Sequence, residues 1–218
     1  MINPNQKYID GTWYEEEYGQ YCYREMYINK PEPEWAVESD QYNVDMVTMI
    51  YGLDKNINIL DCGSGVGQII RAWLNRGFRN IKGIEISKIA TEHANINHIK
   101  HGSVADMSMF KDNEFDLVES VALLEHIDRS IEDQVIKEML RVGRRQAHII
   151  GMDAGSDPSH LNIKTIEEWG LLFAKHAKDV MIFRLNGLLL DLPVLLVFRM
   201  EDAPFPLRHA VQRSMGGK

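Results

Sequence analysis

The sequence has little cysteine, no long apolar run and no apolar segment near its start. Only two of its 218 residues are cysteines, Cys22 and Cys62, too few for a disulfide framework, which favours a reducing compartment. The longest apolar stretch, residues 188–198, is interrupted by Asp191 and Pro193 and is too short to cross a bilayer. The first residues are polar and lack the apolar core of a signal peptide. We therefore expect a cytoplasmic protein with no membrane partner.

Clustered positive charge is also missing. The chain has 24 lysine and arginine residues against 32 aspartate and glutamate residues, a formal net charge of −8. The phosphate backbones of nucleic acids bind clustered basic side chains, so a nucleic-acid partner is not expected. The eight histidines have mixed spacing, and His93, His98 and His101 lack acids or cysteines at metal-ligand intervals. We therefore predict no metal site.

The composition divides the chain into unequal parts. Seven of the eight tyrosines precede residue 43, whereas the first phenylalanine is Phe78. Prolines at 31 and 33 exclude a continuous helix through that point. We expect a small aromatic cap segment at 1–50, a main domain at 51–200 and a loosely held tail at 201–218. The aromatic rings either cover a hydrophobic face or line a pocket.

Strand and helix patterns alternate from residue 57 onward. Such alternation predicts an α/β fold, a Rossmann-like, mostly parallel sheet with helices on both faces. The connection between the last two strands is too short for a crossover helix, so these strands should be antiparallel neighbours. The result is a seven-stranded sheet with one antiparallel strand. The expected strands are 57–62, 81–86, 99–104, 115–121, 146–152, 179–185 and 192–200; the expected helices are 68–76, 87–95, 131–142 and 165–175.

Two short motifs point to a ligand at the carboxyl end of this sheet. The first, DCGSGVG at 61–67, lets the backbone turn sharply and approach a ligand closely. The second is Glu85, at the end of the second expected strand, where a carboxylate accepts hydrogen bonds from ribose hydroxyls. Alone, the first motif is also compatible with a tight strand–helix connection and the second with a surface acid. Their combination favours ribose binding.

Together with three later segments, these motifs resemble a known family. ILDCGSGVGQ and GIEIS, followed by NEFDLVESVALLEHI, LRVG and DPSHLNIKTIEEW, are similar to the motifs of class I S-adenosylmethionine-dependent methyltransferases, in particular the small-molecule and sugar-type members. The resemblance covers roughly residues 57–175. It implies S-adenosylmethionine as cofactor and S-adenosylhomocysteine as product.

The resemblance also implies individual roles. Asp61 helps bind the cofactor ammonium group, and Glu85 holds the ribose hydroxyls. In the segment that contacts adenine, Ser103 occupies the place of the usual acid, with Val104 supplying a backbone N–H; a shifted alignment places Asp106 there instead. The remaining cofactor contacts implied are Gly63, Gly65, Gln68, Ile86 and Val121.

Two histidines are candidate general bases. Methyl transfer from a sulfonium is an in-line displacement that relies on alignment, and a base is needed only when the nucleophile carries a proton. His160 lies on the expected ligand side and is the first candidate; it otherwise orients substrate or caps a loop. His126 is the second candidate, and such a residue more often has a packing role.

These features favour a methyltransferase acting on a small-molecule or sugar-like acceptor. No Asn/Asp-Pro-Pro-aromatic tetrapeptide follows the fourth strand, which counts against the amino-directed branch of the family. Two alternatives stay open: a nicotinamide-dependent oxidoreductase, and a methyltransferase-like non-catalytic module that binds cofactor or stabilises a partner. The acceptor, the atom methylated and the oligomeric state are left open.

Overall fold

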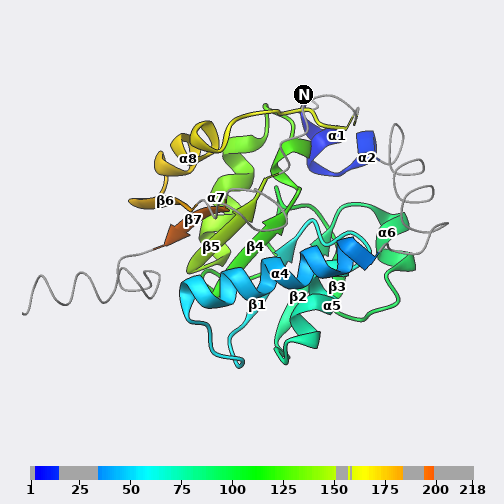
Figure 1. The fold of residues 1–218 in the computed structure, drawn as a ribbon. Helices are drawn as coiled ribbons and strands as arrows, with labels where there is room; N and C mark the ends of the chain where they lie inside the picture. The colour runs from blue at the N-terminus through cyan, green and yellow to red at the C-terminus, as the bar shows by residue number, and fades with distance from the viewer. Residues whose placement is uncertain (1–2, 15–33, 151–156, 158, 184–193, 199–218) are drawn as a thin grey trace, which may run out of the picture.

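A seven-stranded sheet forms the centre of the computed structural model, which describes residues 3–14, 34–150, 157, 159–183 and 194–198 (Figure 1). Its strand order is β3-β2-β1-β4-β5-β7-β6. Strand β7 is antiparallel to both of its neighbours, and all other pairs are parallel. The expected sheet with one reversed strand is therefore confirmed. The strands are β1 (Ile59–Cys62), β2 (Ile81–Glu85), β3 (Ile99–His101), β4 (Leu117–Val121), β5 (Arg145–Ile149), β6 (Asp179–Phe183) and β7 (Val194–Phe198).

Helices cover both faces of this sheet (Figure 1). Successive strand residues point to opposite faces, so Ile59 and Leu117 join the core beneath α4 and α5, whereas Leu60 and Val118 join the core beneath α7 and α8. None of the described helices is long and apolar enough to cross a membrane. The helices are α1 (Gln6–Ile9), α2 (Thr12–Tyr14), α4 (Glu34–Tyr51), α5 (Gln68–Asn75), α6 (Lys88–His93), α7 (Glu132–Val142) and α8 (Ile166–Ala174), with a 3-10 turn η3 (Leu124–His126).

The ends of the predicted helices follow their capping residues. The Ser87 side chain accepts a hydrogen bond from the amide of Ala90 at 3.2 Å, and α6 begins at the next residue. Thr165 and Glu168 form a reciprocal capping box at the start of α8, which satisfies backbone donors that a helix leaves open. Gly143 is the C-cap of α7. These local signals explain why the predicted helix positions agree with the structure.

Helix α4 was not anticipated by the sequence. It runs for 18 residues, from Glu34 to Tyr51, and lies on both sides of the expected division at residue 50. Val44 and Val47 are buried in the same core as strand β1, and the Tyr51 hydroxyl donates to the Gln146 carbonyl of β5 at 2.8 Å. The helix is therefore packed on the sheet as part of the central fold. Residues 15–33 of the expected cap, and the tail at 201–218, lie outside the described residues.

Strand β3 is shorter than predicted. It ends at His101, whereas the pattern suggested a strand reaching residue 104. The backbone of Gly102 still donates to the Glu85 carbonyl at 2.9 Å, and the chain then turns away from the sheet. This departure frees residues 102–104 to form one wall of a pocket.

Candidate functional site

The glycine-rich turn leaves the carboxyl end of β1 and leads into α5. Gly63 and Gly65 have positive φ angles of 73° and 54°, a conformation that glycine adopts without steric cost. A Cβ atom added at Gly63 would lie 2.7 Å from the Leu123 side chain. The missing side chain therefore keeps this wall of the site open. Gln68, the first residue of α5, is half-buried at the end of the turn.

Glu85 connects this turn to strand β2. Its side chain is buried, and its two carboxylate oxygens accept hydrogen bonds from the amides of Gly65 and Ser87, each at 2.8 Å. These bonds fix the carboxylate between the two motifs that the sequence analysis identified. A carboxylate oxygen has more than one acceptor position, so accepting from an amide does not by itself prevent it from accepting from a hydroxyl.

Asp61, at the carboxyl half of β1, is a buried acid. Its Oδ2 atom has no hydrogen-bond partner among the described residues. Burial first, and then the neighbouring charges of Glu85 and Asp40, raise the pKa of Asp61 to about 8, against a weaker opposing hydrogen bond from Ser64. A cationic group with N–H donors would satisfy this oxygen and reverse the effect on the pKa. The ammonium group of S-adenosylmethionine has that chemistry.

Glu119 is a second buried acid beside Asp61, and no motif in the sequence points to it. The two residues face each other in the β1–β4 register, and the Trp73 indole N–H donates to Glu119. Burial and then the charge of Asp61 raise the pKa of Glu119 well above its usual value. Within the described part of the chain neither acid forms an ion pair. The site therefore lacks a positive charge at this point.

A pocket opens in front of these motifs. Its empty volume is about 690 Å³, which includes the open solvent at its mouth. Among the site residues expected from the sequence, it brings together Gly63, Glu85, Ile86, Ser103, Val104 and His126. The other residues that line it are Tyr8, Trp13, Tyr14, Ile84, Gly102, Ala122, Leu123, Ile127, Asp128 and Ile131.

The described N-terminal aromatic residues contribute one side of this pocket. All three residues, Tyr8, Trp13 and Tyr14, line the pocket. Tyr8 also packs against the core beneath α7 and α8, so both roles left open for such rings occur. The rings contact one another, with centroids 5.6 Å apart for Tyr8 and Trp13 and 5.5 Å apart for Trp13 and Tyr14. The same pocket is lined by Ala122 and Leu123, which follow strand β4.

Ser103 and Asp106 lie in different surroundings. Ser103 lines the pocket, and its hydroxyl accepts from the amide of Ala105 at 3.1 Å. Asp106 is exposed and accepts from the amide of Ser108 at 3.1 Å, and this hydrogen bonding from Ser108 lowers the pKa of Asp106. Of the two alignments, the gap-free one thus places its residue in the pocket, while Asp106 caps a turn outside it.

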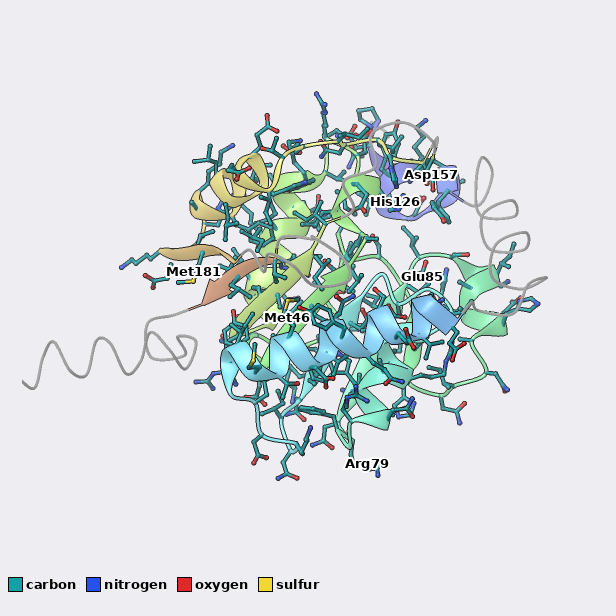
Figure 2. The ribbon with its side chains drawn as sticks, viewed as in Figure 1. Met46, Arg79, Glu85, His126, Asp157 and Met181 are labelled. Carbon is teal, nitrogen blue, oxygen red and sulfur yellow. The ribbon has the colours of Figure 1, made fainter. Side chains whose placement is uncertain are left out.

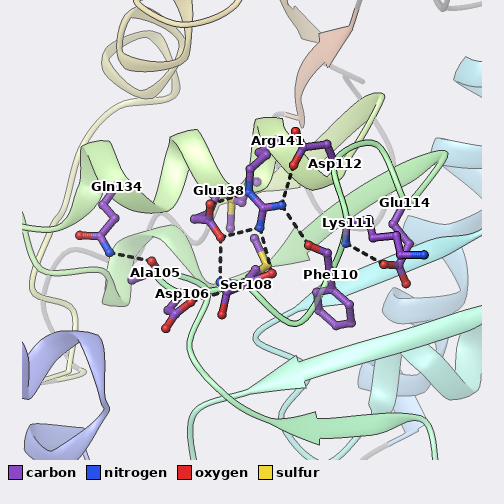
Figure 3. Close-up of polar contacts among 12 residues, drawn as sticks. Ala105, Asp106, Ser108, Phe110, Lys111, Asp112, Glu114, Gln134, Glu138 and Arg141 are labelled. Carbon is purple, nitrogen blue, oxygen red and sulfur yellow. Dashed lines mark hydrogen bonds and ion pairs between the residues drawn. The ribbon is translucent and has the colours of Figure 1, made fainter.

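Arg141 of α7 holds the segment that follows this pocket wall (Figure 3). Its guanidinium donates to the carbonyls of Met107 and Phe110, each at 2.9 Å, and to the carboxylates of Glu138 and Asp112. Glu138 in turn accepts from the amide of Met107 at 2.8 Å. The bonds to Glu138 and then Asp112 raise the pKa of Arg141. The whole set of bonds ties the irregular chain after Val104 to a regular helix.

Val121 ends β4 but does not line the pocket. Its half-buried side chain packs against the core beneath α4 and α5. The next two residues, Ala122 and Leu123, line the pocket instead, and Ala122 has a positive φ of 50°, which is uncommon for a residue with a side chain. The sharp turn directs the chain from the sheet into η3. No signal in the sequence identified this turn.

His126 and His160 come together from separate segments, and Figure 2 shows His126 beside Asp157. Their ring centroids are 4.7 Å apart. The Ser159 hydroxyl donates to Asp157 Oδ1 at 2.6 Å and lies 2.9 Å from His126 Nδ1; the Ser159 carbonyl lies 3.2 Å from the same nitrogen. His160 is not part of the pocket wall.

These contacts fix the tautomer of His126. The Ser159 hydroxyl has one proton and donates it to Asp157, and the Ser159 carbonyl can only accept. The Nδ1 atom of His126 therefore carries the ring proton and donates it to these Ser159 oxygens. The other ring nitrogen, Nε2, therefore carries a lone pair when the ring is neutral. Burial and then the charge of His160 lower the pKa of His126 to about 4, with Asp157 opposing this shift. The ring is neutral at pH 7 but is a weak base.

Comparison with known proteins agrees with this geometry. The profile of a family described as a methyltransferase domain matches residues 60–151, which include the glycine turn, Glu85 and the 3-10 turn. The chain carries a class I S-adenosylmethionine-dependent methyltransferase domain. The resemblance to class I S-adenosylmethionine-dependent methyltransferases is thereby confirmed, and S-adenosylmethionine is the cofactor of this domain family. No curated protein matches the chain.

Solved structures share the fold of this methyltransferase domain. One is magnesium protoporphyrin IX methyltransferase from Synechocystis PCC 6803 with bound S-adenosylmethionine: TM-score 0.61, 13% identity, covering 91% of this chain and 98% of that one. A second, from Anabaena variabilis ATCC 29413, is described as a methyltransferase from an antibiotic biosynthesis pathway: TM-score 0.56, 17% identity, covering 66% and 64%. A third is the [4+2]-cyclase SpnF, with a TM-score of 0.56 and 22% identity; the match covers 71% of this chain and 62% of SpnF. The chain spans less than two thirds of the length of the last two, and at these low identities the structural similarity shows a common fold alone.

Proposed function

We propose that this domain binds S-adenosylmethionine in the described pocket and transfers its methyl group to a small-molecule or sugar-like acceptor. The observation that carries the proposal is the pair of buried carboxylates at the glycine turn. Asp61 offers an unsatisfied oxygen suited to the cofactor ammonium group, and Glu85 is fixed at the pocket wall with acceptor capacity for ribose hydroxyls. Ser103 and Val104 take the adenine side, together with Ile86.

The remaining pocket wall would receive the acceptor. The aromatic side chains Tyr8, Trp13 and Tyr14 and the neutral His126 line it, a combination suited to a ring-bearing molecule with hydroxyl groups. S-adenosylmethionine supplies an electrophilic methyl group when bound. The protein aligns the nucleophile with that group and excludes water, and His126 or His160 accepts the proton of a hydroxyl nucleophile.

We also propose a cellular location and a domain organisation for the protein. The buried free thiol of Cys62 and the acidic net charge of −8 support a cytoplasmic protein whose substrate is not a nucleic acid. We retain the cap at 1–50, the methyltransferase domain at 51–200 and the tail at 201–218 as its proposed organisation, with α4 joining the first two.

A turnover experiment tests the transfer step. S-adenosylmethionine labelled in its methyl group is incubated with the protein and a panel of small hydroxylated and sugar-like compounds, and labelled products are separated by chromatography. We expect at least one acceptor to be labelled by the wild-type protein and not by Glu85→Ala, with Glu92→Ala, at an exposed position on α6, retaining activity. Binding of the cofactor without transfer to any compound would favour the non-catalytic module instead.

A further inference from the structure

Three side chains beside the pocket have the geometry of an open metal site. Glu125, His126 and His160 each offer one ligand atom, and these atoms all lie within 4.8 Å of one another. Glu125 is buried, and the two histidines are half-buried. The spacing along the chain gave no sign of this cluster, because the fold brings the 3-10 turn η3 and the segment after Asp157 together from distant positions.

The two segments are held in place by hydrogen bonds that do not use the ligand atoms. The Asn162 amide donates to the Glu125 backbone carbonyl at 2.9 Å, and the Asn162 side chain donates to Glu132 at 2.7 Å. Lys164 also pairs with Glu132 at 2.7 Å. These contacts fix the segment that carries His160 on η3 and on the start of α7. They therefore hold the three side chains of the cluster near one another.

The contacts of His126 are those of a metal-ligating histidine. Such a histidine usually donates its second ring N–H to a carboxylate or a carbonyl, which fixes the tautomer and the orientation of the ring. His126 Nδ1 donates to Ser159, whose hydroxyl donates onward to Asp157. The lone pair is therefore on Nε2.

We propose that Glu125, His126 and His160 bind a divalent transition-metal ion of the Zn²⁺ type. Two imidazole nitrogens and one carboxylate suit Zn²⁺, Co²⁺ or Fe²⁺, whereas Mg²⁺ and Ca²⁺ prefer oxygen ligands. Zinc–ligand distances of about 2.0–2.2 Å in a tetrahedral site place ligand atoms roughly 3.4 Å apart. The ligand atoms thus need to close by no more than about 1.4 Å to reach that spacing.

Three protein ligands leave a position for an exogenous group, as in catalytic zinc sites. His126 lines the pocket, so we place the open position toward the acceptor. A hydroxyl bound there would lose its proton more easily. With both histidines on the metal, that proton would pass to solvent in place of a histidine; the oxygen would then form the new bond to the methyl carbon, and the S–CH₃ electron pair would return to sulfur. This role rests on the proposed function, whereas metal binding does not.

Cobalt titration tests the metal site without any acceptor. Tag-free protein is treated with a chelator, and Co²⁺ is added while visible absorption is recorded. We expect one equivalent to bind with the d–d bands of a low-coordinate N/O site and without a thiolate charge-transfer band. His160→Gln should weaken binding by at least about tenfold, Ser159→Ala by about tenfold through His126 orientation, and the matched control His93→Gln, at an exposed site, not at all.

The same samples are titrated with S-adenosylhomocysteine, which separates two failures. Absence of a stoichiometric Co²⁺ spectrum in protein that binds S-adenosylhomocysteine would overturn the metal site and leave the cofactor site standing. Equal Co²⁺ affinity in the wild-type protein and in folded His160→Gln would also overturn it. Because His160 lies in a loop, this variant tests the site even if replacement of the buried Glu125 prevents folding.

Discussion

Replacing Asp61 by asparagine should make the protein more stable and a poorer cofactor binder. The folded protein raises the pKa of this carboxyl to about 8, from an ordinary value of 3.8, because the group is buried and lies beside Glu85. The unfolded chain releases the proton at much lower pH. Between about pH 4 and pH 8 the native state therefore holds more protons than the unfolded state, and this group's contribution to stability falls as pH rises.

The size of the effect follows from the pKa difference. At pH 7 the Asp61 carboxyl is ionised in the unfolded chain and takes up a proton on folding. Because pH 7 lies about three units above the ordinary pKa of 3.8, this protonation costs on the order of 4 kcal/mol at 1.36 kcal/mol per unit. Asparagine is neutral at every pH and avoids this cost. Since the buried amide has its own desolvation cost, we expect a gain of about 1–4 kcal/mol at pH 7. The gain should be less than half as large at pH 5.

Cofactor binding should change in the opposite direction. A hydrogen bond to a charged group is worth about 1.5–3 kcal/mol, so losing the Asp61 carboxylate as partner of the ammonium group weakens S-adenosylhomocysteine binding by at least about tenfold. Urea unfolding at pH 5, 7 and 8 measures the first effect, and calorimetric titration measures the second. A stability difference that does not vary with pH, or unchanged affinity, would refute the reasoning.

Two further predictions concern stability. Arg141→Ala removes the donors to Met107, Phe110, Glu138 and Asp112 and should lower the free energy of unfolding in urea titrations by about 2–4 kcal/mol. Replacement of an exposed arginine should change it by less than about 0.5 kcal/mol. Equal effects of the two substitutions would contradict the role of Arg141 in holding the segment after Val104. Burial lowers the pKa of His148 to about 3, so below about pH 6.5 the unfolded chain binds a proton that the folded chain does not, and the contribution of this group to stability falls by about 2 kcal/mol between pH 7 and pH 5. His148→Gln should remove that loss, and an unchanged difference between the pH 7 and pH 5 values would count against the assignment.

Local chemistry explains which parts of the fold could be predicted. Strand positions follow from short apolar runs, and helix starts follow from Ser87 and Thr165, whose caps act within three residues of themselves. Helix α4 was missed because its order depends on distant partners, such as the bond from Tyr51 to strand β5. Its buried residues Val44 and Val47 belong to a core that includes strand β1, so only the folded sheet reveals their role.

The site likewise contains some residues that short motifs reveal and others that only the folded chain brings together. The glycine turn and Glu85 are recognisable because each is a short motif at a strand end. The pairing of Asp61 with Glu119 depends on the register of two strands, and the meeting of His126 with His160 depends on the path of a loop. The sequence contains all four residues but does not show which of them become neighbours. Pocket residues Ala122 and Leu123 were missed because the turn after β4 carries no glycine.

Calorimetric titration with S-adenosylhomocysteine tests the central claim most directly. Wild-type protein and Glu85→Ala are compared, with NAD as a second ligand and an unfolding curve to verify that the variant is folded. The account predicts micromolar binding, roughly −8 kcal/mol, weakened at least about tenfold in the variant because the ribose hydroxyls lose a charged acceptor, and no comparable binding of NAD. Binding of NAD in preference to S-adenosylhomocysteine, or an affinity unaffected by Glu85→Ala, would contradict it.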